Sequence, residues 1–458
     1  MEDSATTNVT GRLAEFFAAT PFGDLPPEVI HEAKRSIVDG IGVALGGADH
    51  PSTEILLKYC RTAGGTPEAQ AWGHRDRLPV QFAALVNGHQ GHVLDFDDTF
   101  LPPETALHAT VPLLSPLLAV AEVRHSSGRE VLRAFALGFE AEARLALALG
   151  RSHLLAGWHV TATTGPVGAA VGVGVLIGLD PAKLRHAMGI AVTHSGGVTA
   201  MFGSMSKAYQ CGKAAEAGVR AALLAEIGFD GPAEPLTHPQ GYLNVASQDR
   251  AMERLTGRLG QKYLILENGY KPYASGVVTH PLIDALTALR KEGLKPDQID
   301  RIEVRVNPFV LQVTGQAEPQ TGLQGKFSAY HCAAAALLDG TARKAQFTDS
   351  RVNDPGAIAL RRRVTLIPEE SIRRDECWVA VRLKEGATLE KHVPRASGTA
   401  ENPLSDAVLA DKFLDLAAPL IGPRARQALD LVWGLDGLAD AARVPPLLRA
   451  GHESMQIS

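Results

Sequence analysis

Apolar residues recur with a helical period along most of the first 260 residues. The segment PPEVIHEAKRSIVDGIGVAL begins with prolines that suit a first helical turn and ends at a Gly-Gly pair. The same period predicts further helices over residues 80–93, 108–123, 130–149, 165–179, 181–192 and 205–227. Several are rich in glycine and alanine, and small residues let helix backbones approach closely. This pattern predicts a multi-helix bundle whose central members have no solvent face.

The pattern changes after residue 259, where short β-branched or alternating apolar runs replace the helical period. These runs predict strands at residues 263–266, 301–306, 364–367 and 377–383. Helical periods predict two helices among them, over residues 280–291 and 328–338. Strands and helices that stay separate in sequence are typical of an α+β domain. From Ser405 the helical period returns and continues toward the end of the chain.

The simplest architecture for this order is a mainly α protein with two domains. A chain of 458 residues exceeds the roughly 250–300 residues at which one hydrophobic core stops growing. We therefore expect a large all-α helical domain formed by residues 1–266 plus 400–458. A smaller α+β lid domain, residues 267–399, is expected to be inserted into it.

Composition narrows the class of protein. Apolar residues make up 45% and charged residues 21% of the chain, as is ordinary for a soluble globular protein. The net charge is −5 and no basic run could follow a phosphate backbone, which argues against nucleic-acid binding. Four widely spaced cysteines form no CxxC pair, so neither a zinc site nor a disulfide scaffold is expected. A reducing, cytoplasmic location fits this cysteine usage.

The sequence predicts neither an export signal nor a membrane segment. The N-terminus, MEDSATTNVTGRLAEFF, has early acidic residues and no basic region before an apolar stretch, unlike a signal peptide. Two uncharged stretches, residues 105–121 and 160–179, are the candidates for a membrane span. Threonine and glycine open the second stretch, which leaves an apolar helix shorter than the roughly 20 residues a span requires. Both stretches therefore predict helices buried in a helical core.

The segment VLDFDDTF, residues 93–100, places three aspartates within four residues and a threonine after them. Read literally, Asp95 to Thr99 fits the DxDxT motif of haloacid-dehalogenase-type phosphatases. That site needs a buried strand directly before the first aspartate, but the preceding residues, ALVNGHQGHVL, continue a helix. Helix capping accounts for one aspartate but not for three beside His92 and His108. The segment therefore predicts a chemical site.

The segment NGHQGHVLDFDDTF, followed by LHATVPLL, resembles the motif NG…H.LDFDDT….HP of the 2-methylcitrate dehydratase (MmgE/PrpD) family. Five further blocks resemble family motifs in the same order along the chain. They are GWHVTATTGPVGAA, SMSKAYQCGKAAEAGVRAALLAEIGFDGP, NGYKPYASGVVTHPLIDA, GKFSAYHCAAAALLDG and NPLSDAVLADKFLDLA. Together the blocks cover most of the chain and both expected domains.

The resemblance implies a helical domain with an inserted α+β lid, usually in a homodimer. It also implies an enzyme of small di- or tricarboxylates that needs no metal or organic cofactor. The leading interpretation is a hydro-lyase of a 2-methylcitrate-like or citrate-like acid, which removes a proton beside a carboxylate. Two alternatives stay open: an epimerase of an imino- or aminodicarboxylate, and a decarboxylase of a cis-aconitate-like acid. A helical protein that binds carboxylates without catalysis is the non-enzymatic alternative.

The matched motifs also imply the residues of the site. Lys207, at the start of its helix, and Lys271 are expected to meet across a cleft and bind substrate carboxylates without belonging to the core. His108 and His159 are the candidate proton carriers, because imidazole titrates near neutrality. Asp95 is expected to orient a histidine or a substrate hydroxyl. The expected substrate-binding side chains are Thr99, Tyr273, His280, Tyr330 and His331, and no metal ligand set is expected.

The chain departs from the family motifs at three places. Three extra residues and an alanine separate the aspartates from His108, which predicts a displaced imidazole. Gly276 stands where the lid motif commonly has cysteine or histidine, which removes one potential proton carrier. In FSAYHC, His331 takes the usual tyrosine position and Tyr330 precedes it. These positions are expected to select substrate and reaction, so the resemblance alone does not fix the reaction.

Overall fold

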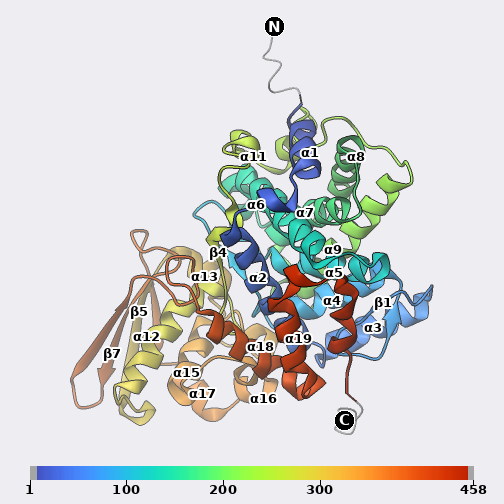
Figure 1. Cartoon of the computed structure of the whole chain (residues 1–458). Helices are drawn as coiled ribbons and strands as arrows, with labels where there is room; N and C mark the ends of the chain where they lie inside the picture. Colours follow the sequence, from blue (N-terminus) through green and yellow to red (C-terminus); the bar gives the residue numbers. More distant parts are fainter. Residues whose placement is uncertain (1–7, 452–458) are drawn as a thin grey trace.

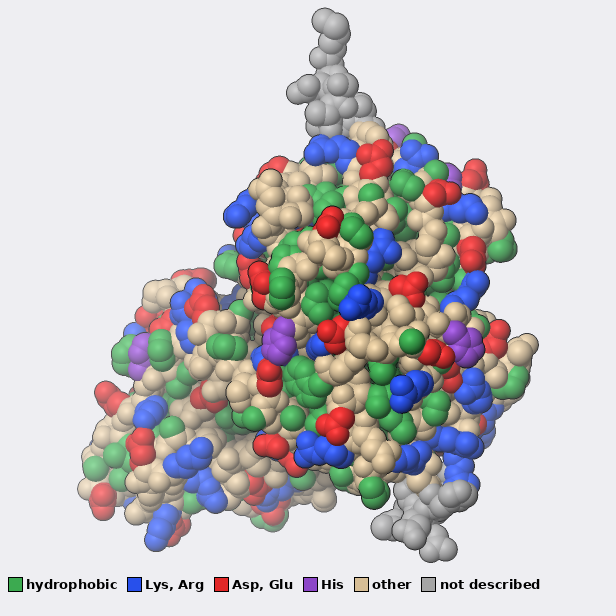
Figure 2. Space-filling view, in the orientation of Figure 1, with side chains coloured by type: hydrophobic (Ala, Val, Ile, Leu, Met, Phe, Trp, Pro, Cys, Tyr) green, Lys and Arg blue, Asp and Glu red, His purple; other side chains and the backbone are tan. Residues whose placement is uncertain are grey.

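The computed structural model describes residues 8–451. The expectation about a signal peptide and the outer limits of the expected helical domain fall partly on residues 1–7 and 452–458, outside this range. None of the described helices combines the length and the hydropathy that a membrane span requires. On the face shown in Figure 2, acidic and basic side chains are interspersed rather than gathered by sign.

The larger part of the chain is helical (Figure 1). The helical period of the sequence predicts most of its helices. Its helices are α1 Val9–Ala19, α2 Pro27–Gly46, α3 Pro51–Ala63, α4 Val80–Val93, α5 Thr110–Arg124, α6 Gly128–Leu155, α7 Val160–Leu176, α8 Pro181–Val192, α9 Met205–Glu226, α10 Tyr242–Ala246 and α11 Glu253–Thr256. Local signals set several ends. Asp180 accepts a hydrogen bond from the N–H of Lys183 at the start of α8, and Ser127 forms a capping box with Glu130 at α6.

Glycine allows the central helices to touch. A Cβ on Gly212 of α9 would lie 2.3 Å from the carbonyl oxygen of Leu85 of α4, so only glycine fits this crossing. α7 is buried along its whole length, as its lack of a polar face predicts, and packs between α6 and α9. The crossing of α4 and α9 brings His92, near the end of α4, beside Lys207, near the start of α9.

The other part of the chain combines helices with a four-stranded sheet in the order β6–β5–β7–β8. Its elements are α12 His280–Lys291, β5 Ile299–Val306, α13 Pro308–Thr314, α14 Gly322–Gly325, α15 Ala329–Asp339, α16 Asp349–Val352, α17 Pro355–Arg361, β6 Val364–Pro368, β7 Cys377–Leu383 and β8 Thr388–Val393. β5 pairs in parallel with β6 and antiparallel with β7. Alternate residues of β5 and β7 are buried in a second hydrophobic cluster with α12 and α15. The mainly α fold with a smaller α+β part is thus confirmed, while the lid boundaries stay a prediction.

Two links join the α+β part to the helical part. The short strands β3, Thr99–Phe100, and β4, Asn268–Gly269, pair antiparallel, which sets the chain before Lys271 against the aspartate segment. The second link is helix α18, Asp406–Ile421, which follows the α+β part in the chain and packs on α2 of the helical part. Helix α19, Arg424–Trp433, comes after α18. A second short pair, β1 Ala69–Gln70 with β2 Arg77–Leu78, lies beside α4.

The strand predicted at residues 263–266 is wrong. Leu264–Glu267 form a 3-10 helix, because Leu264 and Ile265 pack into the helical core and the N–H of Leu264 bonds Glu140 of α6. A short apolar run of this kind satisfies its backbone without a strand partner.

Several helix starts also differ from the prediction, among them those of α7 and α5. α7 begins at Val160, five residues early, because the hydroxyls of Thr163 and Thr164 donate to the Val160 carbonyl and fit inside the helix. α5 begins at Thr110, which leaves His108 in the loop before it. Both uncharged stretches considered as membrane spans are buried core helices, as predicted.

Candidate active site

A cavity of about 490 Å³ has walls from both parts of the chain. It brings together six of the predicted site residues: Asp95, Thr99, His108, His159, Lys207 and Lys271. Apolar side chains form much of the remaining wall: Leu101, Trp158, Phe202, Val277, Val278, Phe309, Val313 and Phe327. Residues from α9 and from the segment after β4 thus line one cavity.

Asp95 lies at the centre of the charged side of this cavity. Lys207 Nζ donates to Asp95 Oδ1 at 2.8 Å, and Lys271 Nζ donates to the same oxygen at 2.9 Å. Asp95 Oδ2 has no hydrogen-bond partner among the described residues. Two ammonium groups sharing one carboxylate leave a net positive charge, which favours an anionic ligand.

Both lysines belong to the core, so the prediction that they lie outside it is wrong. Lys207 is 5% exposed and Lys271 is 2% exposed. Lysine is rarely buried unless it is paired, and Asp95 supplies the pairing here. Burial alone would raise the pKa of Asp95, but the charges of Lys207 and Lys271 outweigh it and hold that pKa well below its ordinary value. Asp95 is therefore ionised at neutral pH.

The backbone around Asp95 explains its position. Asp95 follows α4 with a φ of 50°, in the left-handed region that few side chains adopt. Because a helix rather than a buried strand precedes it, the phosphatase interpretation of DFDDT is wrong. Asp98 does serve as a helix cap: its carboxylate accepts from the N–H and the hydroxyl of Thr110, at the start of α5. Capping therefore explains one aspartate of the three.

His159, directly before α7, lines the cavity. Its Nδ1 lies 2.7 Å from Gln210 Oε1, and Gln210 Nε2 donates to the Val198 carbonyl at 3.1 Å. Since Gln210 Oε1 can only accept, Nδ1 of His159 carries the proton and Nε2 carries the lone pair. Nε2 is buried without a partner among the described residues. Burial, with contributions from His92 and Lys207, lowers the pKa of His159 well below 6.5, so the ring is neutral.

His92 and His108 are held by the aspartate segment. His92 Nδ1 lies 2.8 Å from Asp97 Oδ2, and its Nε2 accepts from Lys207 at 2.9 Å. His108 Nδ1 donates to the Asp98 carbonyl at 2.8 Å and lies 3.5 Å from Asp97 Oδ2. Burial lowers the pKa of both imidazoles well below 6.5. Despite the extra residues before it, His108 reaches the cavity.

His92, Asp97 and His108 also form a group that could hold a metal ion, with ligand-type atoms within 4.8 Å of one another. A cation there would displace the proton that His92 Nδ1 shares with Asp97, and it would lie close to the Lys207 ammonium. Two neutral imidazoles and a carboxylate are suitable ligands for a divalent metal. The neighbouring ammonium makes the same place unfavourable for a cation.

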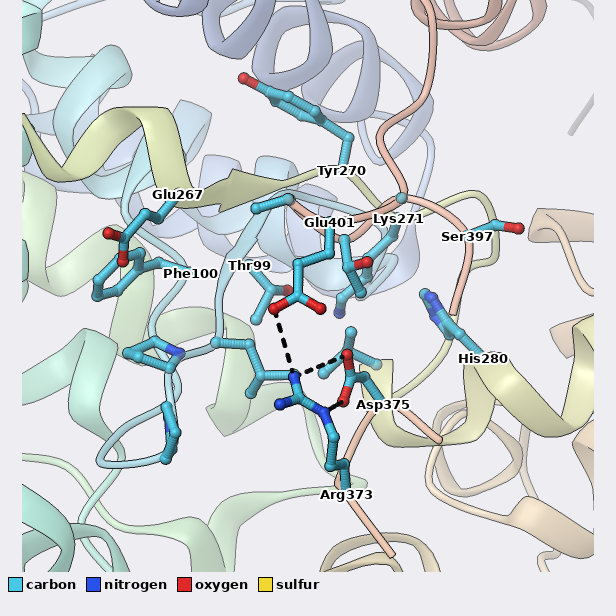
Figure 3. A pocket seen from close by; sticks show the side chains of 18 residues that line it. Thr99, Phe100, Glu267, Tyr270, Lys271, His280, Arg373, Asp375, Ser397 and Glu401 are labelled. Atoms are coloured by element: carbon cyan, nitrogen blue, oxygen red, sulfur yellow. Dashed lines mark hydrogen bonds and ion pairs between the residues drawn. The ribbon is translucent and has the colours of Figure 1, made fainter. Parts of the chain in front are cut away.

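A second cavity, of about 480 Å³, adjoins the first. The two cavities share Thr99, Leu101, Lys271 and Val277. Figure 3 shows Arg373 of the second cavity joined to Asp375 and Glu401, near Lys271 and His280. The positive charge of Arg373 in the second cavity is therefore already paired with two carboxylates.

The remaining predicted residues do not line the first cavity. His280 lines the second one, where its Nε2 lies 3.3 Å from the Ser275 carbonyl and burial lowers its pKa to about 3. The Tyr273 hydroxyl donates to Asp284 at 2.7 Å. His331 Nε2 lies 2.9 Å from the Gln346 carbonyl, and Tyr330 is half-buried outside the cavity lining. His331 therefore packs within the α+β part, beside Phe347, and not in the cavity.

Gly276 does line the first cavity. A Cβ there would lie 2.9 Å from Thr314 Cγ2, so a cysteine or histidine at this position would require Thr314 to move. The loss of a proton carrier at Gly276 is thus accompanied by closer packing against α13.

Sequence reasoning missed several residues of the site. Gln210 follows Lys207 by three residues on α9, and this spacing places both on one helix face, so periodicity could have identified it. Lys326 and Lys412 are 3% exposed and bind backbone carbonyls around Asp95, from positions more than 200 residues away in the chain. No local pattern indicates these two contacts.

Comparisons with known proteins agree with this architecture. The family model described as the MmgE/PrpD N-terminal domain matches residues 11–255, and the model of the MmgE/PrpD C-terminal domain matches residues 273–436. The chain is 28% identical to the cis-aconitate decarboxylase of Mus musculus over 462 residues, 96% of this chain and 93% of that protein. It is 28% identical to the Homo sapiens cis-aconitate decarboxylase, covering 96% and 95% of the two chains. Identity to the cis-aconitate decarboxylase of Aspergillus terreus is 27%, over 99% and 98%.

The two matched regions together span nearly the whole chain, including the helices and loops that carry Asp95, His159 and Lys207 and the segment that follows Lys271. The chain therefore belongs to the MmgE/PrpD family.

Proposed function

We propose that this chain is a lyase that decarboxylates cis-aconitate or a closely similar tricarboxylic acid. The observation that carries the proposal is the Asp95 carboxylate with its two buried ammonium groups, in the same cavity as Nε2 of His159. The relatives named cis-aconitate decarboxylase, at 27–28% identity over nearly the full chain, support this substrate class. Decarboxylation therefore replaces the hydro-lyase reaction as the leading hypothesis.

In this proposal Lys207 and Lys271 bind two carboxylates of the acid. Charge-assisted hydrogen bonds of this kind are worth about 1.5–3 kcal/mol each. The C–C bond to the departing carboxylate breaks, CO₂ leaves, and the electron pair moves into the conjugated alkene and its carboxylate. A proton then forms the new C–H bond. A trianion and one proton thus become a dianion and CO₂, and the apolar walls favour this loss of charge.

His159 delivers the proton in the proposed mechanism. Its lone pair at Nε2 takes up one proton when the trianionic acid enters, because a nearby negative charge raises an imidazole pKa. Gln210 keeps the ring oriented throughout, since it binds the opposite nitrogen. His108, whose Nδ1 is held by the Asp98 carbonyl, is the second candidate for a proton carrier.

A hydro-lyase of a citrate-like acid is the second candidate function. It is favoured by the neutral state of His159, whose depressed pKa suits a base that removes a proton beside a carboxylate. The same lysines would bind the carboxylates, so the two reactions differ in the bond that breaks. The epimerase alternative would need only proton exchange at the same carbon.

Incubation with cis-aconitate in D₂O separates these reactions. Decarboxylation releases CO₂ and gives a product with one solvent deuterium, seen by NMR, whereas a hydro-lyase converts citrate or 2-methylcitrate to an alkene without CO₂. An epimerase exchanges a proton of an imino- or aminodicarboxylate and releases neither CO₂ nor an alkene. Absence of CO₂ from cis-aconitate, with alkene formation from citrate or 2-methylcitrate, would reject the decarboxylase.

The same assay in EDTA tests metal independence, which we propose because two lysines already neutralise the substrate carboxylates. Loss of activity on chelation, restored by Mg²⁺ or Fe²⁺, would point to His92, Asp97 and His108 as a metal site. We also propose that the working species is a homodimer, as the family resemblance implies. Sedimentation near the chain mass of 48.6 kDa would contradict it.

A further inference from the structure

Three consecutive backbone carbonyls at the centre of the site each accept a hydrogen bond from a different lysine. The Leu94 carbonyl lies 2.7 Å from Nζ of Lys326, and the Asp95 carbonyl lies 3.1 Å from Nζ of Lys271. The Phe96 carbonyl lies 2.6 Å from Nζ of Lys412. These lysines come from three separate segments of the chain, before α15, after β4 and within α18.

Lys326 and Lys412 also bind the segment that carries Lys271. Lys326 Nζ donates to the Ala274 carbonyl at 3.0 Å, and Lys412 Nζ donates to the Lys271 carbonyl at 2.9 Å. Each ammonium therefore bridges one carbonyl beside Asp95 and one carbonyl of residues 271–274. We call this pair of buried lysines the carbonyl clamp.

The clamp is costly, which indicates that it has a role beyond packing. Both ammonium groups are buried, and a buried charge is unfavourable unless it is paired and hydrogen-bonded. Lys412 pairs with Asp39 at 2.7 Å, whereas the partners of Lys326 among residues 8–451 are the two carbonyls and the Phe347 ring, 4.6 Å away. Burial lowers the pKa of Lys326 to about 7.

The clamp holds two residues: Asp95, whose backbone is in the left-handed region, and Lys271, which binds the Asp95 carboxylate. Asp95 has a φ of 50°, which is unfavourable for an aspartate without support from its surroundings. Neither Lys326 nor Lys412 belongs to the wall of the cavity in which we propose that the acid binds. Their bonds instead fix the relative position of the Asp95 carboxylate and the Lys271 ammonium, which are 2.9 Å apart.

We propose that Lys326 and Lys412 are positioning residues that set the geometry of the carboxylate-binding pair Asp95 and Lys271. This inference rests on the proposed function, because it assigns the clamped pair to carboxylate binding. The clamp acts from outside the cavity, through backbone carbonyls on both sides of Asp95 and on the segment after Lys271.

The test replaces each clamp lysine by methionine, which keeps the aliphatic length and removes the ammonium. In Lys326→Met and Lys412→Met, kcat/KM for cis-aconitate and the affinity for propane-1,2,3-tricarboxylate, measured by calorimetry, are expected to fall roughly ten- to a hundredfold. The control is Lys183→Met, which loses an ammonium bond to the Glu226 carbonyl away from the cavity. The control is expected to change neither quantity more than about twofold, within the range of independent surface changes.

A double-mutant cycle with Asp95→Asn separates positioning from general stability. If the clamp acts through Asp95, each clamp substitution should lower affinity less than about threefold once the Asp95 charge is gone. Losses that multiply independently would overturn the proposal, as would full affinity in both clamp variants. Failure of both variants to fold would also overturn it, because the clamp would then serve the fold as a whole.

A second variant tests the charge itself. Lys326→Ala should regain part of its affinity with n-butylammonium, which can donate to the same two carbonyls, and not with n-butanol. Equal rescue by both compounds would indicate lost packing and contradict the proposal. If the wild type binds the tricarboxylate and the cycle shows coupling but no CO₂ is formed, the proposed reaction fails and the clamp stands. A wild type that binds no tricarboxylate rejects both.

Discussion

Two neighbouring cavities of nearly equal volume, about 490 and 480 Å³, differ in how their charges are matched. In the first, Lys207 and Lys271 share the single carboxylate of Asp95. In the second, Arg373 is paired with Asp375 and Glu401, so its charge is already neutralised. We therefore expect the first cavity to attract a carboxylate and the second not to, although Lys271 lines both.

The two cavities thus differ in the state of their polar atoms rather than in their volume. Among the described residues that line the first cavity and not the second, Asp95 Oδ2 and His159 Nε2 are buried polar atoms without partners. A buried polar atom without a hydrogen bond is unfavourable, so such atoms indicate where a ligand or water binds.

The largest effect is expected for His159→Gln. Loss of a positioned proton carrier typically costs 10²- to 10⁴-fold in rate, and kcat should fall more than KM rises. Steady-state kinetics with cis-aconitate measure both constants. His186→Gln, a half-buried histidine bonded to the Gly231 carbonyl, is the matched control and should keep full activity. Equal activity of the two variants would remove His159 from the mechanism.

The pH dependence of kcat/KM should span about a hundredfold over two pH units. The pKa of His159 in the free enzyme lies well below 6.5, so a reaction that needs its protonated form slows about tenfold per unit as pH rises from 6.5 to 8.5. His159→Gln should abolish this slope. A hydro-lyase that starts from neutral His159 would give a flat profile over the same range, which would contradict the proposed decarboxylation.

Lys207→Met and Lys271→Met should each lower kcat/KM roughly ten- to a hundredfold, because one charged hydrogen bond to a substrate carboxylate is lost. Each should also lower the free energy of unfolding by about 1.5–3 kcal/mol, since buried Asp95 loses one of its two ammonium partners. Kinetics and urea unfolding measure the two effects. The control is Lys213→Met on the same helix, whose ammonium binds the Gly196 carbonyl.

The smallest effect is expected for Arg373→Met in the second cavity. Its side chain is 48% exposed and its ion pairs are solvent-accessible, so stability should change by less than about 1 kcal/mol. We expect kcat/KM for cis-aconitate to change less than about threefold, in contrast to the lysine variants. A loss as large as that of Lys271→Met would show that the second cavity takes part in binding.

The sequence predicts most helices because their apolar spacing and end signals are local. α4 and α12 have the predicted bounds, and Asp180 caps α8 as expected. β8 lacks a predicted counterpart because its side chains are partly exposed on both faces, so no alternation marks it. The fold class can be predicted from such local patterns, whereas elements with a weak pattern, such as β8, cannot.

The site is only partly predictable for a physical reason. The family motifs identify Asp95, Lys207 and Lys271, but the burial of both lysines depends on a carboxylate 112 and 176 residues away in sequence. A rule based on the usual exposure of lysine therefore fails here. The clamp lysines, Lys326 and Lys412, bind backbone carbonyls, which have no side-chain signature in sequence.

We propose that the substrate carboxylates bind in the first cavity, beside Lys207 and Lys271. The most direct test is a crystal structure with bound propane-1,2,3-tricarboxylate, which lacks the alkene needed to stabilise the charge left by CO₂. We expect one carboxylate of this ligand within hydrogen-bond distance of Lys207 and another within that distance of Lys271. A carbon of the ligand should face Nε2 of His159. A ligand bound at Arg373 in the second cavity, with the first cavity empty, would contradict it.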